Sequence, residues 1–293
     1  MKKLFFAIVS AVTVASSAVF AGNLFSYVPA DSQAVVKIDA ASILSRPEAV
    51  KVLNDPVAMA KQLEFSSKAG CSIKDLKSAV IAVGDAGSEV FLFELSKKID
   101  VAAALKNLGV ENTPAKVGKY TVYQGDQRAA ISQISGNIVI VGSPEDVKAA
   151  LEGQQGMSAE LTALAKPFAA STEAIAWLVF DAGKSCKGSA VYKFCGQDKA
   201  DHDFSAQLIL KNAEEAAQTA AMVPMYVGMF SGAIFAQNPE LGAKVAKGFK
   251  VKTAGSNLEL KLNISAALAD EIASYMAEQG KKSLLSPGKK SEK

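Results

Sequence analysis

The chain has 293 residues, 49% of them hydrophobic and 21% charged, with a net charge of +3, three cysteines and one histidine. This length is enough for one large core or two of ordinary size. The balanced charge gives no electrostatic footprint for nucleic acid, and one histidine without a Cys-x-x-Cys pair argues against a metal site. We therefore predict no nucleic-acid partner, no metal and no cofactor.

Residues 1–21 have the pattern of a cleaved secretory signal peptide. Lys2 and Lys3 are followed by an uncharged apolar run, and small residues precede a cut after about Ala21. The pattern predicts export and a periplasmic or secreted location. At the other end, residues 280–293 carry five lysines and one glutamate, so the body between the two ends has a charge of about −3. This basic tail is predicted to be disordered.

The start of the mature chain is read as a strand from Ala34 to Asp39, followed by helices at about 41–53 and 56–67. The segments Tyr27–Asp31 and Gly70–Ser78, with the strand ending at Asp39, resemble the opening of large exported bacterial proteins of the planctomycete and lentisphaera type. The resemblance covers about residues 26–95, and its motifs are structural. It implies export, a bacterial origin and a duplicated α+β body, and it implies no activity.

Residues 135–151 are predicted to form a turn, a buried strand and a helix. Gly136-Asn137 favours a tight turn, and the uncharged, β-branched run Ile138–Val141 is typical of a strand covered on both faces. Ser143 stands where an N-cap belongs, and Pro144 occupies the first helical position. This unit is the most clearly signalled in the chain.

Similar ββα patterns occur at 78–108 and 249–278, with a partial copy that begins at Phe204. They suggest internal duplication, although ββα is also a common local arrangement. We expect an α+β fold, with a mainly antiparallel sheet and helices on one face, built from repeated ββα units in two related halves. The halves are assigned to residues 22–153 and 154–279, and the sequence leaves open whether they share one sheet.

The three cysteines suit an oxidising compartment. Cys186 and Cys195 enclose eight residues, including a glycine, which favours a loop disulfide between them and leaves Cys71 free. Three cysteines allow three pairings, and the sequence does not choose among them.

Motifs that suggest chemistry are weak. The Gly-Lys-Ser within Asp181–Ser185 lacks the earlier glycine of a phosphate loop and is read as a turn. Asp201-His202-Asp203 could orient a histidine for acid–base work, but no nucleophile motif accompanies it. The pairs Glu214-Glu215 and Asp270-Glu271 are explained by helix capping and solvation. No catalytic residue is predicted.

The segment with most functional potential is 216–239, which carries no charged residue. Its apolar side chains with helical spacing along one face are Met222, Met225, Tyr226, Met229 and Phe230. Three interpretations are open. The favoured one is a helix buried in the core, the second is an apolar face or groove for a ligand or partner, and the third is a membrane span.

These observations favour an exported, non-enzymatic binding or scaffold protein of the bacterial envelope, with an unidentified envelope protein or an apolar ligand as its partner. One alternative is an envelope hydrolase whose site the sequence does not assemble. Another is a single-pass membrane-anchored protein that uses 216–239, although a membrane span is the least favoured interpretation. The sequence does not predict an oligomeric state.

Overall fold

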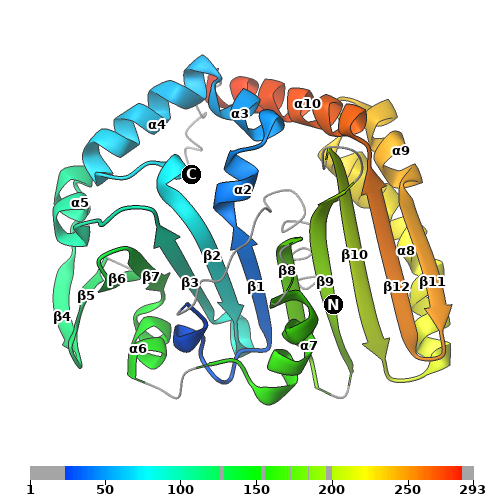
Figure 1. The fold of residues 1–293 in the computed structure, drawn as a ribbon, viewed down its shortest axis with the longest axis horizontal. Coiled ribbons are helices and arrows are strands. Elements are labelled where there is room, and N and C mark those ends of the chain that lie inside the picture. The colour runs from blue at the N-terminus through cyan, green and yellow to red at the C-terminus, as the bar shows by residue number, and fades with distance from the viewer. Residues whose placement is uncertain are drawn as a thin grey trace, which may run out of the picture.

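The computed structural model describes residues 24–125, 129–152, 156–169, 171, 173–183, 185–195 and 200–285. The proposed signal peptide, the proposed boundary at 153–154 and the end of the tail lie outside these residues. The described strands form one twelve-stranded antiparallel sheet (Figure 1). The strands are β1 (Ala34–Asp39), β2 (Leu76–Val83), β3 (Glu89–Leu95), β4 (Thr113–Val117), β5 (Tyr120–Gln124), β6 (Ala130–Ser135), β7 (Ile138–Gly142), β8 (Ala174–Asp181), β9 (Cys186–Cys195), β10 (Asp201–Leu210), β11 (Phe249–Ala254) and β12 (Asn257–Ile264).

The helices connect these strands. The α-helices are α2 (Ala40–Leu44), α3 (Pro47–Leu53), α4 (Pro56–Ala69), α5 (Val101–Leu108), α6 (Pro144–Glu152), α7 (Ala159–Ala169), α8 (Ala213–Ile234), α9 (Pro239–Lys247) and α10 (Ala266–Leu285), and the short 3-10 helices are η1 (Leu24–Tyr27), η2 (Ile73–Asp75) and η3 (Asp85–Gly87). The helix predicted at 41–53 is divided at Arg46. The next residue, Pro47, disfavours a helical backbone at the residue before it.

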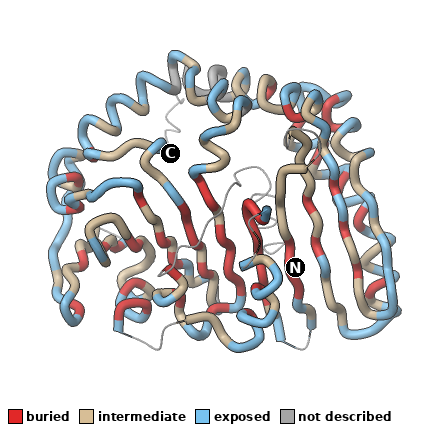
Figure 2. The backbone as a smooth tube through the Cα atoms, in the orientation of Figure 1, coloured by how far each residue is buried: buried red, intermediate tan, exposed pale blue. Residues whose placement is uncertain are grey.

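The strand order is β11-β12-β10-β9-β8-β1-β2-β3-β7-β6-β5-β4. The first strands of the two proposed halves, β1 and β8, therefore meet in the middle, where Val36 lies opposite Leu178. The α+β class and the antiparallel sheet are confirmed, and strands from both halves belong to one sheet. The centre of this sheet is covered on both faces, because every residue from Ala174 to Phe180 on β8 is buried (Figure 2).

Helices lie on both faces of the sheet, so the prediction of helices on one face is wrong. Successive residues of a strand point to opposite faces. Val35 belongs to a core cluster with residues of η1, α6 and α7, whereas Val36 belongs to a cluster with residues of α8. Figure 1 shows α7 in front of the sheet and α8 behind it. The sequence could not assign these faces because the β1–β8 pairing is non-local.

The unit at 135–151 folds as predicted, with a turn between β6 and β7 followed by α6. The Ser143 hydroxyl accepts a hydrogen bond from the Asp146 backbone N–H at 3.1 Å and donates to the Asp146 carboxylate at 2.7 Å. The side chain of Ser143 thus satisfies an N–H group at the start of the helix that has no partner within the helix.

The proposed repeats are not equivalent in space. Hairpins followed by helices occur as β2–β3–α5, β6–β7–α6 and β11–β12–α10. However, α6 packs in the core cluster of η1 and α7, α5 contributes to a separate cluster, and α10 packs beside α9. Duplication therefore stays a prediction. The tail was predicted to be disordered from residue 280, but α10 continues to Leu285.

Candidate functional site

Helix α8 begins at a well-formed cap. The Asn212 side chain accepts a hydrogen bond from the Glu215 backbone N–H at 2.8 Å, and Glu214 and Glu215 lie in the first turn, where carboxylates favour the helix dipole. The helix continues through Pro224 to Ile234. At 22 residues it is about 33 Å long, at about 1.5 Å per residue.

One side of α8 packs on the sheet. Val223 and Val227 are buried in the cluster that contains Phe204 of β10 and Leu258 of β12. The interpretation of 216–239 as a membrane-spanning segment is therefore wrong, since α8 packs on strands, ends at Ile234 and is followed by a separate helix. Within the described part of the chain, we find no helix that is both long and apolar enough to cross a membrane.

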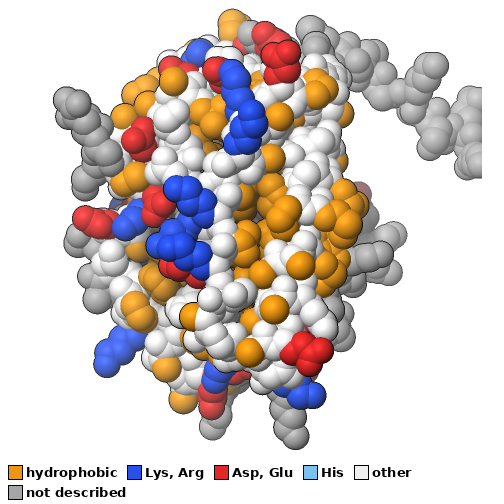
Figure 3. All heavy atoms as spheres, turned by 90° about the vertical axis from the view of Figure 1, so that its right-hand side faces the viewer, with side chains coloured by type: hydrophobic (Ala, Val, Ile, Leu, Met, Phe, Trp, Pro, Cys, Tyr) orange, Lys and Arg blue, Asp and Glu red, His pale blue; other side chains and the backbone are white. Residues whose placement is uncertain are grey.

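The opposite side of α8 is exposed and apolar. The exposed fractions are 41% for Met222, 55% for Met225, 36% for Tyr226 and 62% for Met229. We call these four residues, together with the exposed small residues Ala221, Gly228 and Gly232 on the same side of the helix, the α8 outer face. Figure 3, which views this side of the molecule, shows apolar side chains gathered there and charged ones around them.

Four of the five residues predicted for an apolar face thus lie on the exposed side of the helix. The fifth, Phe230, is half-buried. The interpretation of 216–239 as a helix wholly inside the core is wrong, because only one side of α8 is covered.

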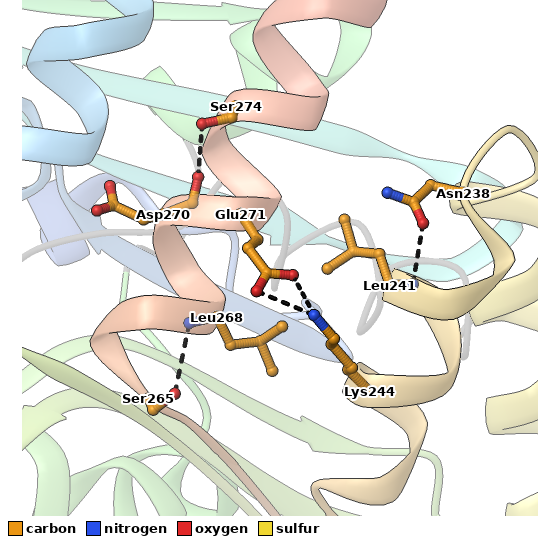
Figure 4. A network of polar contacts seen from close by, with 8 residues as sticks. All are labelled: Asn238, Leu241, Lys244, Ser265, Leu268, Asp270, Glu271 and Ser274. Atoms are coloured by element: carbon orange, nitrogen blue, oxygen red, sulfur yellow. Dashed lines mark hydrogen bonds and ion pairs between the residues drawn. The ribbon is translucent and has the colours of Figure 1, made fainter.

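The far end of α8 is followed by α9, and Figure 4 shows the polar contact between α9 and α10. Lys244 of α9 forms an ion pair with Glu271 of α10 at 2.6 Å. Asn238 caps α9 by accepting a hydrogen bond from the Leu241 backbone N–H at 3.1 Å. Phe235, just after α8, is buried against Tyr275 of α10, with the ring centroids 5.4 Å apart. The end of α8 is therefore held in place by several contacts with α9 and α10.

The sequence reasoning did not predict that two charged residues of the central strand β1, Lys37 and Asp39, are buried. Lys37 is 5% exposed and Asp39 3% exposed, and both point to the same face of β1. Burial lowers the pKa of Lys37, although Asp39 and Glu94 favour its charged form. Burial also raises the pKa of Asp39 to about 6, against the hydrogen bonds that its carboxylate accepts from Ser42 and Ala41. The only sequence feature that points to this buried pair is a single lysine within an apolar strand.

The acid–base candidate at 201–203 is not assembled as an acid–histidine–acid group. These residues lie on β10, where alternation sends the His202 side chain to one face and both aspartates to the other. Asp201 accepts a hydrogen bond from the Ala266 backbone N–H at 2.9 Å, and His202 Nδ1 contacts the Tyr192 hydroxyl. These contacts connect β10 with the start of α10 and with β9.

Two other predicted features also have clear positions. The Gly183 N–H donates to the Asp181 carboxylate at 2.8 Å in a tight turn, and Lys184 lies outside the described residues. Cys186 and Cys195 lie at opposite ends of β9, about 30 Å apart at a rise of about 3.3 Å per residue. The predicted disulfide is therefore wrong. All three cysteines are free and half-buried, and burial raises the pKa of each thiol.

Two open pockets lie elsewhere. One, of about 410 Å³, is lined by residues that include Tyr120, Tyr123 and Gln133. The other, of about 380 Å³, lies beside Asp270 and Glu278 on α10. The second pocket is also lined by Asn238, Glu271, Ser274 and Tyr275. Among the described residues, we find no cluster of His, Cys, Asp and Glu that could hold a metal ion.

The fold and the α8 outer face define an α+β protein with one large antiparallel sheet and a helix that exposes one apolar side. No protein-family model matches the sequence, and no curated protein matches it either. Among solved structures, crystal form III of TP0453 is similar, with a TM-score of 0.50 and 10% identity over 87% of this chain and 97% of that chain. Crystal form I of TP0453 is also similar, with a TM-score of 0.47 and 10% identity over 87% of this chain and 96% of that chain. At this level of identity, the likeness to form III shows the fold alone.

Proposed function

We propose that the chain is an exported, non-enzymatic binding protein of the bacterial envelope that holds an apolar partner or ligand on the α8 outer face. The observation that carries the proposal is the exposure of Met222, Met225, Tyr226 and Met229 on one side of a well-anchored helix. The signal-peptide pattern of residues 1–21 supports export.

The size of the apolar surface supports this proposal. Taking a fully exposed side chain of this size as about 200–250 Å², the four exposed fractions amount to roughly 400 Å² of apolar surface. The largest apolar patch on a typical monomer has about 300–600 Å² and is often functional, so the α8 outer face has the size expected of such a patch. Methionine suits such a surface because its flexible, polarisable side chain adapts to different shapes.

The proposal can be tested by titration of the mature protein, residues 22–293, with the uncharged fluorescent probe N-phenyl-1-naphthylamine. We expect saturable binding that weakens at least tenfold in the double variant Met225→Lys/Met229→Lys, because two charges then interrupt the apolar surface. The matched control is Leu63→Lys on α4, a residue that is 64% exposed on another helix. This control should leave binding unchanged. Equal binding by wild type and double variant would refute the proposal.

A further inference from the structure

The α8 outer face is complementary to itself when two copies of the helix are placed antiparallel about Met225. In this register, Met222 faces Gly228 of the second copy and Met229 faces Ala221, so these two long side chains each meet a small residue, while Met225 meets Met225 and Tyr226 faces Pro224. Gln218 faces Gly232 in the same way, and all these positions are exposed. We infer that the partner of the α8 outer face is a second copy of this chain, related by a two-fold axis at Met225. The inference rests on the proposed function and names its partner.

The helix has room for this contact. A Cβ atom built on Gly228 or Gly232 would meet no other atom within 4 Å, so the space above both glycines is open. Small residues let two helix backbones approach closely. The positions 218, 222, 225, 229 and 232 alternate by four and three residues, which is the spacing of a seam between two helices packed side by side.

Charge favours the antiparallel arrangement. Residues 216–239 carry no charge, so a second copy brings no buried ion that needs a partner. Glu214 and Glu215 lie at the start of α8. In the antiparallel pair, the acids of the two copies lie about 33 Å apart, since 22 helical positions separate them at about 1.5 Å each. A parallel pair would place the four carboxylates together and would be destabilised by their repulsion.

The available area limits the size of the contact. If the four side chains were buried completely in both copies, roughly 800 Å² of apolar surface would be covered, and at about 65% apolar area the whole contact would be at most about 1,200 Å². This is the lower end of the range for specific interfaces. The dimer should therefore be reversible, with a dissociation constant in the micromolar range.

Sedimentation equilibrium of the mature protein at 1–200 µM tests the inference. Wild type should dimerise, and Met225→Lys should weaken dimerisation at least 100-fold because two lysines then face each other on the axis. Met225→Glu should do the same. An equimolar mixture of the Met225→Lys and Met225→Glu variants should dimerise again, because the axis then pairs opposite charges. The control variants Leu63→Lys and Leu63→Glu should dimerise as wild type does.

A monomeric wild type at 200 µM would overturn the inference. So would unaltered dimerisation of Met225→Lys, or a mixture that stays monomeric after each variant alone has lost the dimer. The probe titration is carried out well below 1 µM protein, where the dimer has dissociated. Its result is therefore independent of dimerisation. A monomeric wild type that still binds the probe through Met225 and Met229 leaves the proposed function standing without the second copy. Flotation of such a monomer with vesicles of phosphatidylethanolamine and phosphatidylglycerol (3:1) would also overturn the inference and identify a lipid surface as the occupant.

Discussion

The buried carboxylate of Asp39 makes a quantitative prediction about stability. Asp39 ends β1 and caps α2, accepting hydrogen bonds from the Ala41 N–H at 3.1 Å and the Ser42 N–H at 3.4 Å. Asparagine in its place keeps a side-chain oxygen for these bonds and removes the charge. The Asp39→Asn variant therefore isolates the cost of burying a carboxylate at this position.

The magnitude follows from the pKa of Asp39, which burial raises from 3.8 to about 6. The folded state then binds the proton more tightly than the unfolded state, so this group lowers stability as the pH rises from about 4 through about 6. At about 1.4 kcal/mol per pKa unit, the carboxylate costs about 3 kcal/mol of folding free energy at pH 7.5. The value of about 6 already includes the attraction of the Lys37 ammonium, which favours the charged carboxylate. We therefore expect the variant to gain about 3 kcal/mol at pH 7.5.

Urea denaturation of the mature protein at pH 4.0, 5.0, 6.0 and 7.5 can measure this gain. The single tryptophan, Trp177, is buried and stacks on Phe25, so its fluorescence reports unfolding of the core. Asp39→Asn should be close to wild type at pH 4.0 and about 3 kcal/mol more stable at pH 7.5. The control is Asp31→Asn at an exposed position, which should change stability by less than about 0.5 kcal/mol at every pH. A difference between Asp39→Asn and wild type that stays constant with pH would refute the reasoning.

Four further predictions concern packing and cysteines. Gly188→Ala should destabilise the protein by about 3 kcal/mol or more in urea denaturation, because its Cβ would lie 2.3 Å from the Gln207 carbonyl oxygen. Gly232→Ala, in open space on α8, should instead raise stability by about 0.5–1 kcal/mol, and the reverse order would contradict the packing described. Leu92→Ala, at a fully buried core position, should cost about 2–5 kcal/mol by the same assay, and a cost below about 1 kcal/mol would argue against that core. The unreduced protein, denatured and reacted with a thiol reagent, should show three free thiols per chain, whereas one would restore the predicted disulfide.

Local signals in the sequence predicted local structure well. The bounds of β1 and the start of α6 followed from an apolar run and from the Ser143-Pro144 cap, which depend on neighbouring residues. The apolar face of α8 followed from helical spacing, and only Phe230 is turned partly inward.

Features that depend on distant residues were missed. The disulfide failed because Cys186–Cys195 is an extended strand paired along its whole length with β10, and its one glycine packs closely against that strand instead of forming a turn. The burial of Lys37 depends on its cross-strand neighbours, Val80 on β2 and Trp177 on β8. A lysine between apolar residues reads as solvent-facing when these neighbours are unknown.

The meeting of β1 and β8 at the centre of the sheet has a consequence for synthesis of the protein. Asp39 ends one partner and Asp181 ends the other, so about 140 residues must be added before the first strand gains its second neighbour. At about 5–20 residues per second, this takes roughly 7–30 s. During that interval one edge of β1 has unpaired backbone groups, which are a template for wrong pairing. A nascent chain halted before residue 174 should therefore aggregate more readily than one released after residue 181.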